Sequence, residues 1–153
     1  MNTARIRSRQ QGASTVEFAL VAAFGGFLLV LIGIFELGRI MYTFNTASEA
    51  TRLGARTAIV CDAGDERIKS AMMALLPSLS VDQIDISYQP SGCAASATAA
   101  RAACTSVTVS LNSSAQLSTV IPFVPLSINI PPFTTTMTRE AMDSSKCDGG
   151  NLP

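Results

Sequence analysis

The stretch Gln11-Gly12-Ala13-Ser14-Thr15-Val16-Glu17-Phe18 joins a basic leader to a long apolar run and decides the fold of this chain. The leader contains three arginines (Arg5, Arg7 and Arg9) and no acidic residue, whereas residues 18–35 contain no charged residue. A secretory signal peptide places its apolar region before the cleavage site and loses that region on processing. Here the expected processing site, the Gly12–Ala13 bond, precedes the apolar run, so cleavage would leave the run on the mature chain.

The apolar run is long enough to span a membrane. Residues 18–35 include twelve Leu, Ile, Val or Phe side chains, which together contribute about −5 kcal/mol on the insertion scale. Glu17 opposes insertion by at most ~3 kcal/mol, and by less because it lies at the boundary. Eighteen helical residues cover about 27 Å, which matches a bilayer core. A run that is apolar on every face argues against a buried helix of a soluble protein, and we expect the lipid bilayer to be a partner.

The charges indicate how the span is oriented. The chain of 153 residues has 11 basic and 11 acidic residues, but residues 1–12 carry three arginines and no acid. A basic segment directly before a membrane span favours a cytoplasmic N-terminus. Three arginines without interleaved aromatic residues are a poor nucleic-acid motif, so we expect no nucleic-acid partner. The residues after the span are then expected outside the cytoplasm.

All four cysteines, Cys61, Cys93, Cys104 and Cys147, follow the membrane segment. An even number in a small exported domain indicates two disulfides in an oxidising compartment. Zinc is disfavoured because the chain has no histidine and no Cys-x-x-Cys pair. Three pairings are open; Cys93 and Cys104 bracket a short Ala/Ser/Thr-rich segment that they could close as a local loop, leaving Cys61 to pair with Cys147.

The composition also disfavours catalysis. There is no histidine, the cysteines are expected in disulfides, and the chain lacks paired carboxylates and a glycine-rich phosphate loop, so the usual acid–base and nucleophilic groups are missing. Asp82 and Asp85 fall short of the ligand set that calcium requires. We therefore expect no enzyme activity, no cofactor and no metal.

Helical character continues beyond the membrane segment. No proline occurs before Pro77, and apolar or small residues recur at spacings of three and four after residue 36. Such spacing places them on one stripe of a helix that extends from Ala13 to about Ile59. The stripe consists of Ile40, Phe44, Ala47, Thr51, Gly54 and Ala58. Two pairs spaced by three residues, Glu36/Arg39 and Glu49/Arg52, are expected on a solvated face.

The rest of the chain predicts a small α+β domain. Asp62–Asp65 breaks the long helix, and Gly64 or Asp65 caps a short second helix that ends near Pro77. Three β-rich runs follow, at residues 84–88, 107–111 and 133–138. Prolines make residues 120–132 a loop or an edge segment. The expected fold is a long N-terminal helix whose second half packs on an antiparallel sheet of three or four strands, stabilised by disulfides.

Glu17 is the residue most suggestive of function. A carboxylate at the mouth of a membrane segment is costly and needs a partner. Cleavage after Gly12 would create an α-amine on Ala13, one helical turn from Glu17. Our hypothesis is that Glu17 forms a salt bridge to that amine, of the same or a neighbouring subunit, and so sets the register between subunits. The alternative is that Glu17 lies solvated at headgroup level.

Three segments together resemble a known family. Gly12-Ala13-Ser14-Thr15-Val16-Glu17-Phe18-Ala19-Leu20, Phe35-Glu36-Leu37-Gly38-Arg39 and Ala50-Thr51-Arg52-Leu53-Gly54-Ala55-Arg56 are similar to the TadE-like pseudopilins of the tight adherence (Tad/Flp) pilus system. The similarity is dense over residues 10–60, and residues 134–140 resemble, less specifically, the strand that closes those domains.

The resemblance implies a type IV pilin-like fold and processing by a prepilin peptidase at Gly12–Ala13. It also implies contact with other major and minor pilin subunits and with the inner-membrane assembly platform. Major pilins of that system are much shorter, so a minor pilin that initiates, caps or assists the fibre is expected. We thus divide the chain into a leader (1–12), a long helix (13–60, transmembrane in 18–35) and an exported domain (61–153). The protein is expected first in the bacterial inner membrane and later at the cell surface.

Two other interpretations stay open at this stage. A pseudopilin of a type II secretion system shares the same glutamate, although the Glu-Leu-Gly-Arg and Gly-Ala-Arg segments favour the tight adherence family. A single-pass, membrane-anchored binding domain outside the cytoplasm would be neither cleaved at Gly12 nor assembled into a filament.

Overall fold

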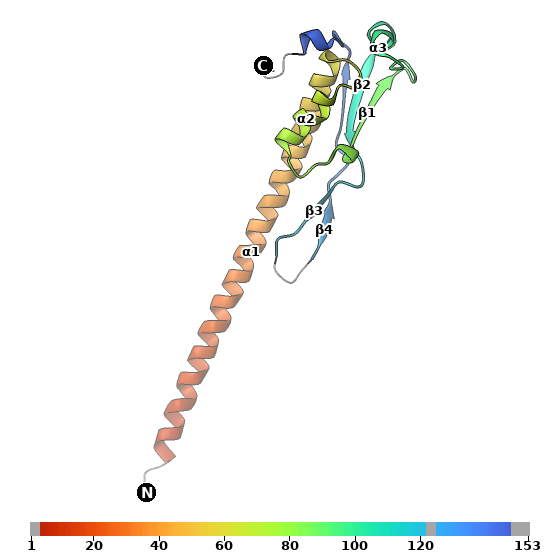
Figure 1. The fold of residues 1–153 in the computed structure, drawn as a ribbon. Coiled ribbons are helices and arrows are strands. Elements are labelled where there is room, and N and C mark those ends of the chain that lie inside the picture. Colours follow the sequence, from red (N-terminus) through yellow and green to blue (C-terminus); the bar gives the residue numbers. More distant parts are fainter. Residues whose placement is uncertain (1–3, 122–124, 148–153) are drawn as a thin grey trace. The chain divides into compact units, whose positions relative to one another are not determined.

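The computed structural model describes the backbone of residues 4–121 and 125–147, and the side chains from Ser14 onward within these ranges except Lys146 (Figure 1). The chain forms two compact units, Met1–Arg39 and Ile40–Pro153. The first unit is helical, and the second combines helices with two small antiparallel sheets. The expected α+β, pilin-like class with a long N-terminal helix is confirmed.

The first element, α1, spans Ala4–Val60. It begins earlier than the expected Ala13 because the leader is free of proline and glycine before Gly12 and contains the strong helix formers alanine, arginine and glutamine. It ends where expected, just before the Asp62–Asp65 break. Gly64 lies in that break with φ at +81°, a conformation that glycine adopts without strain.

Within the second unit, the stripe on the α1 residues 40–60 faces the core, as predicted. Ala47, Thr51, Gly54 and Ala58 are buried, and Ile40 and Phe44 are half-buried. The small side chains let other elements approach the helix closely: a Cβ on Gly54 would lie 2.4 Å from Sδ of Met72 and 3.3 Å from Cγ1 of Val109.

Helix α2 spans Glu66–Leu75 and begins at the predicted cap. The Asp65 carboxylate accepts a hydrogen bond from the backbone N–H of Arg67 at 2.9 Å, which satisfies one donor of the first turn. The apolar face of α2 buries Ile68 and Met72. A short 3₁₀ turn, Val81–Gln83, then leads into the sheet.

The main sheet has three antiparallel strands in the order β1-β2-β5. They span Ile84–Gln89, Ser106–Leu111 and Thr134–Thr138, close to the three predicted runs. Alternation of side chains gives β2 a buried row of Val107, Val109 and Leu111 and leaves Ser106, Thr108 and Ser110 on the other face. On β5, the Thr135 hydroxyl lies 3.2 Å from that of Thr51, which joins the sheet to α1.

One β-hairpin and one helix were not predicted. Strands β3 (Gln116–Ser118) and β4 (Ser127–Asn129) pair as a separate antiparallel hairpin, which places the proline-rich stretch at an edge but gives it regular pairing at its base. Helix α3 (Ala97–Ala103) occupies the segment that we expected to be a loop between Cys93 and Cys104. Its alanines favour a helix, and the Ser96 hydroxyl caps it by accepting from Ala99 N–H at 3.1 Å.

Candidate functional site

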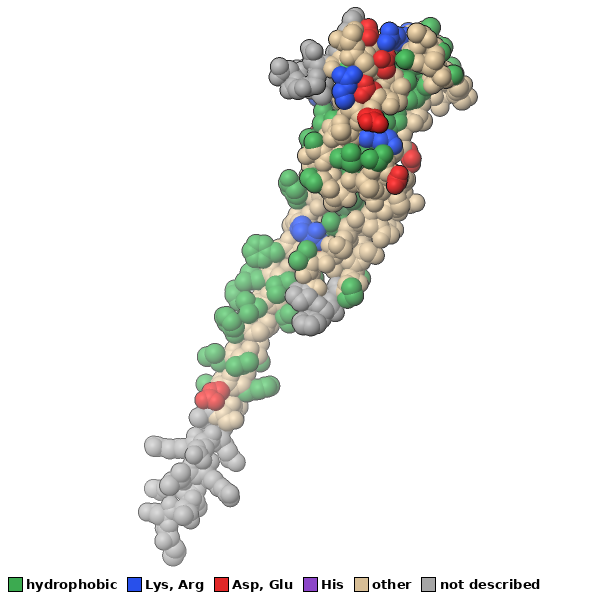
Figure 2. Space-filling model, viewed as in Figure 1, with side chains coloured by type: hydrophobic (Ala, Val, Ile, Leu, Met, Phe, Trp, Pro, Cys, Tyr) green, Lys and Arg blue, Asp and Glu red, His purple; other side chains and the backbone are tan. Residues whose placement is uncertain are grey.

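The first unit contains the predicted membrane segment. Within the described residues, one helix, Ser14–Val60, is long and apolar enough to cross a membrane. From Ser14 to Val30 every side chain is exposed, including those of Phe18, Leu20, Phe24 and Phe27. Figure 2 shows these apolar side chains projecting from the helix on several sides. Such a surface is stable only when lipid or other apolar helices cover it.

Glu17 interrupts this apolar surface near its start. Its side chain is exposed between the exposed side chains of Val16 and Phe18. Among the residues that the structure describes, no lysine or arginine forms a salt bridge with the Glu17 carboxylate. The carboxylate is therefore available for a partner outside this chain or for a new amine on it.

Gly12 and Ala13, the expected cleavage site, lie within the bounds of α1, and their side chains lie outside the described residues. Helical geometry places residue 13 one turn before residue 17, on the same side of the helix. The arrangement thus keeps the spacing on which the register hypothesis depends.

Two ion pairs follow on α1. Arg39 contacts Glu36 at 2.6 Å and Arg52 contacts Glu49 at 2.8 Å, as their spacing predicts. The second pair is exposed, but the first is not on a solvated face as expected, because Glu36 is buried and Arg39 is half-buried. The guanidinium of Arg39 donates two hydrogen bonds to Glu36, which satisfies the carboxylate despite its burial.

The second unit holds two disulfides, Cys61–Cys147 and Cys93–Cys104. The first joins the end of α1 to the C-terminal tail, across 86 residues of sequence. The second closes the short segment that contains α3. Two disulfides in the domain after the apolar helix agree with the oxidising compartment inferred from the cysteine count.

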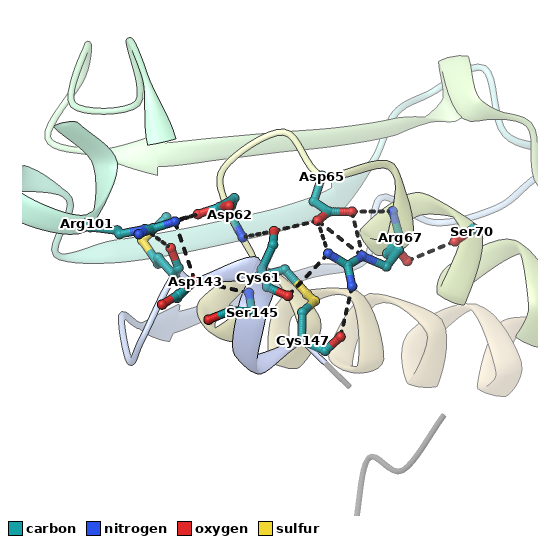
Figure 3. Close-up of polar contacts among 11 residues, drawn as sticks. Cys61, Asp62, Asp65, Arg67, Ser70, Arg101, Asp143, Ser145 and Cys147 are labelled. Atoms are coloured by element: carbon teal, nitrogen blue, oxygen red, sulfur yellow. Dashed lines mark hydrogen bonds and ion pairs between the residues drawn. A yellow bond between two sulfur atoms is a disulfide. The ribbon is translucent and has the colours of Figure 1, made fainter. Parts of the chain in front are cut away.

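Charged residues lie around the Cys61–Cys147 disulfide (Figure 3). Together with the hydroxyl group of Ser144 they form what we call the tail cluster: Asp62, Asp65, Arg67, Arg101, Asp143 and Ser144. Arg101 lies 2.6 Å from the Asp62 carboxylate and 3.5 Å from that of Asp143. It thereby links α3, the turn after α1 and the tail. Asp143 also accepts from the backbone N–H of Ser145 at 3.0 Å.

The other half of the tail cluster is centred on Asp65. Its carboxylate contacts the Arg67 guanidinium at 2.7 Å and accepts from the Ser144 hydroxyl at 2.7 Å. Arg67 also donates to the carbonyl oxygen of Cys147 at 2.9 Å. Hydrogen bonds from Arg67 hold the pKa of Asp65 well below its usual range, and those from Arg101 lower the pKa of Asp62.

The tail cluster connects the turn after α1, helix α3 and the C-terminal tail. Each of its carboxylates already has a cationic or hydroxyl partner, and no group of three or more potential metal ligands occurs among the described residues. From the sequence, Asp62 and Asp65 were predicted only as helix-breaking and capping residues. Their long-range partners were missed because Arg101 and Ser144 are 39 and 79 residues away in sequence.

The residues that carry the sequence motifs lie on α1, and a comparison with family models matches this part of the chain. Residues 12–56 match the model described as TadE-like protein. The chain carries a TadE-like segment. This segment includes Gly12, Ala13, Glu17 and most of the buried stripe, and it ends before the first cysteine. No curated protein and no solved structure matched the chain.

The match agrees with the family resemblance that the sequence motifs carry, over residues 12–56. The candidate membrane helix agrees with the membrane anchor expected from the sequence.

Proposed function

We propose that this TadE-like chain is a non-enzymatic minor pilin that a prepilin peptidase processes between Gly12 and Ala13. The observation that carries the proposal is the exposed Glu17 carboxylate, which stands at the start of an uncharged apolar helix and one turn after the future N-terminus. A membrane anchor alone gains nothing from a carboxylate at that position, because its insertion costs free energy.

Glu17 acts in this proposal as the residue that sets subunit register. Cleavage leaves an ammonium group on Ala13, and a carboxylate in an apolar bundle is stabilised by such a partner. An amine of the same subunit or of its neighbour satisfies Glu17 only at particular axial offsets between the helices. The exposed apolar side chains on the rest of the segment supply the non-specific part of the association.

The domain after the anchor supports a minor rather than a major role. Residues 40–153 form a disulfide-bonded α+β unit with its own core, whereas the fibre of this system is built mainly from a much shorter pilin. Before assembly, the chain lies in the bacterial inner membrane with its N-terminus in the cytoplasm and its domain in the periplasm, where it meets the assembly platform. After assembly it initiates, caps or assists the fibre at the cell surface.

Processing is tested by the N-terminal sequence and the intact, non-reduced mass of the protein from its own membrane. A chain that begins at Ala13 supports the proposal. Gly12→Leu should accumulate as the full-length precursor, because a bulky side chain at this position blocks the protease cleft. Gly33→Leu, at an exposed glycine of the same helix with open space around it, is the matched control and should be processed normally.

The register role is tested separately with Glu17→Gln, which removes the charge and keeps the size. We expect normal cleavage and membrane insertion but reduced co-purification with sheared pili and fewer pili per cell. Glu49→Gln is the control, since Glu49 is an exposed glutamate of the same helix outside the apolar segment. Unchanged pilus output and incorporation in the Glu17→Gln strain would refute the register role. A wild-type chain that retains Arg5, Arg7 and Arg9 would instead favour an uncleaved, anchored binding domain.

A further inference from the structure

The Cys93–Cys104 bond, which we call the local disulfide, needs little of the fold in order to form. Its cysteines lie in the connection between β1 and β2 and are separated by 11 residues. The backbone contacts around them are equally local. Cys93 N–H donates to the carbonyl of Pro90 at 3.1 Å, and Cys104 N–H donates to that of Ala100 at 3.0 Å. The β1–β2 pair and helix α3 are therefore sufficient to bring the two cysteines together.

The Cys61–Cys147 bond, which we call the tail disulfide, depends on distant parts of the second unit. Its cysteines are 86 residues apart in sequence. The tail reaches the end of α1 through Met142, whose N–H donates to the carbonyl of Ile59 at 3.0 Å. This carbonyl belongs to the last turn of α1, where the helix itself supplies no further N–H donors. The tail disulfide can therefore form only after the tail has docked on the end of α1.

Arg101 connects the two disulfides. It lies on α3, within the segment that the local disulfide closes. Its guanidinium lies 2.6 Å from the carboxylate of Asp62, the residue directly after Cys61. The same guanidinium donates to the carbonyl oxygen of Met142 at 2.9 Å and lies 3.5 Å from the Asp143 carboxylate, both in the tail. A single side chain on α3 thus holds the two segments that the tail disulfide joins, as Figure 3 shows for the charged groups.

The lengths of the loops favour the local disulfide as the first to form. Its separation of 11 residues is the shortest among the four cysteines, and the next shortest, between Cys61 and Cys93, is 32 residues. The probability of closing a flexible loop falls with about the 3/2 power of its length, so an unfolded chain forms the local pair about fivefold more often than the Cys61–Cys93 pair. Once the local disulfide exists, Cys147 is the remaining partner for Cys61.

We propose that this domain is oxidised in a fixed order, in which the local disulfide forms first and Arg101 then positions Cys147 against Cys61 for the second oxidation. Arg101 is in this scheme a positioning residue for the tail disulfide. The oxidant is a disulfide of a thiol–disulfide oxidoreductase in the oxidising compartment. A cysteine thiolate attacks this donor disulfide, and its partner thiolate then attacks the mixed disulfide. The donor leaves as a dithiol with the two electrons, and the two thiol protons pass to solvent and to the donor thiolates.

The fixed order makes the tail disulfide a mark of a complete domain. Its formation requires the end of α1, helix α3 and the tail to be in place together. The proposal rests on the export of the domain to an oxidising compartment. It does not rest on cleavage at Gly12 or on the register role of Glu17, so the two proposals fail independently.

The first test follows the oxidation of the complete chain. The reduced, urea-unfolded protein is diluted into detergent micelles with oxidised glutathione, and samples are trapped with N-ethylmaleimide and mapped by peptide mass spectrometry. We expect the local disulfide in most one-disulfide molecules, at least about fivefold above the Cys61–Cys93 pair. One-disulfide molecules that contain mainly the tail disulfide or the Cys61–Cys93 pair would overturn the proposed order.

The second test asks whether the dependence runs in one direction. Replacing Cys61 and Cys147 by serine should leave the rate of forming the local disulfide unchanged. Replacing Cys93 and Cys104 by serine should slow formation of the tail disulfide, because α3 and Arg101 are then no longer held in place. A tail disulfide that forms at the wild-type rate without the local pair would contradict the proposal.

The third test addresses Arg101 itself. Arg101→Gln should slow formation of the tail disulfide by up to about fivefold, the effect of losing a partly exposed ion pair, and should leave the local disulfide unaffected. Arg52→Gln is the matched control, since Arg52 is an exposed arginine in an ion pair of the same unit. Equal rates in Arg101→Gln and Arg52→Gln would refute the positioning role, whatever the stability of the two variants.

Discussion

Gly54 gives the sharpest test of how α1 packs on the rest of its domain. A Cβ built on Gly54 would lie 2.4 Å from Sδ and 2.8 Å from Cγ of Met72, and 3.3 Å from Cγ1 of Val109. Met72 and Val109 are fully buried, so neither side chain can move into solvent. Gly54→Ala therefore overpacks the core, which costs about 1–3 kcal/mol, and gains up to about 1 kcal/mol of helix propensity. We expect a net loss of about 1 kcal/mol in the free energy of unfolding.

Two further variants separate these opposing effects. Asn45→Ala, at an exposed position of α1 in the same unit, changes helix propensity without overpacking and should gain up to about 0.7 kcal/mol. Met72→Ala by itself should lose about 2–5 kcal/mol, because it leaves a cavity. In that background Gly54→Ala should become stabilising by up to about 1 kcal/mol, since the added methyl group enters the vacated space.

The assay is urea unfolding of the complete chain in detergent micelles, without reductant. Near-ultraviolet circular dichroism follows the domain through Tyr88, whose half-buried ring lies on β1. The reasoning is refuted if Gly54→Ala is as stabilising as Asn45→Ala in the wild-type background. It is also refuted if the effect of Gly54→Ala is the same with and without Met72, because the close approach would then have no energetic consequence.

Three other predictions follow from contacts in the second unit. Replacing both Cys61 and Cys147 by serine should lower the free energy of unfolding by about 4–5 kcal/mol, because this disulfide closes a loop of 86 residues. Replacing Cys93 and Cys104, which are separated by 11 residues, should lower it by about 3 kcal/mol in the same unfolding assay. Folding lowers the pKa of Asp65 from 3.8, so the ionised carboxylate stabilises the folded state above pH 3.8, and this stabilisation is lost as the pH falls below that value. In Asp65→Asn the unfolding midpoint should therefore decrease less steeply as the pH is lowered. Thr51→Val keeps the shape of a buried side chain but removes its hydrogen bonds to Thr135 and to the carbonyl oxygen of Ser48, so the free energy of unfolding should fall by about 1 kcal/mol; an unchanged midpoint would show that these contacts together contribute nothing.

Local sequence patterns were sufficient for most of the helices and strands. The spacing of Ile40, Phe44, Ala47 and their successors predicted the buried face of α1, because helical periodicity depends only on neighbours three and four residues away. The same holds for the Asp65 cap and for the strands that alternate polar and apolar residues. Helix α3 was missed because its small residues carry no apolar period, and only their helix propensity and the Ser96 cap favour it.

The same difference between local and long-range contacts separates the predicted site residues from those found only in the structure. Gly12, Ala13 and Glu17 lie within a few residues of one another, so the sequence by itself determined their spacing, the apolar span and the resemblance to TadE-like proteins over this segment. Only the tertiary structure decided the tail cluster, where Arg101 meets Asp62 and Ser144 meets Asp65, and the course of the β3–β4 hairpin. The physical reason is that these contacts join residues far apart in the chain, and their formation depends on how the elements between them pack.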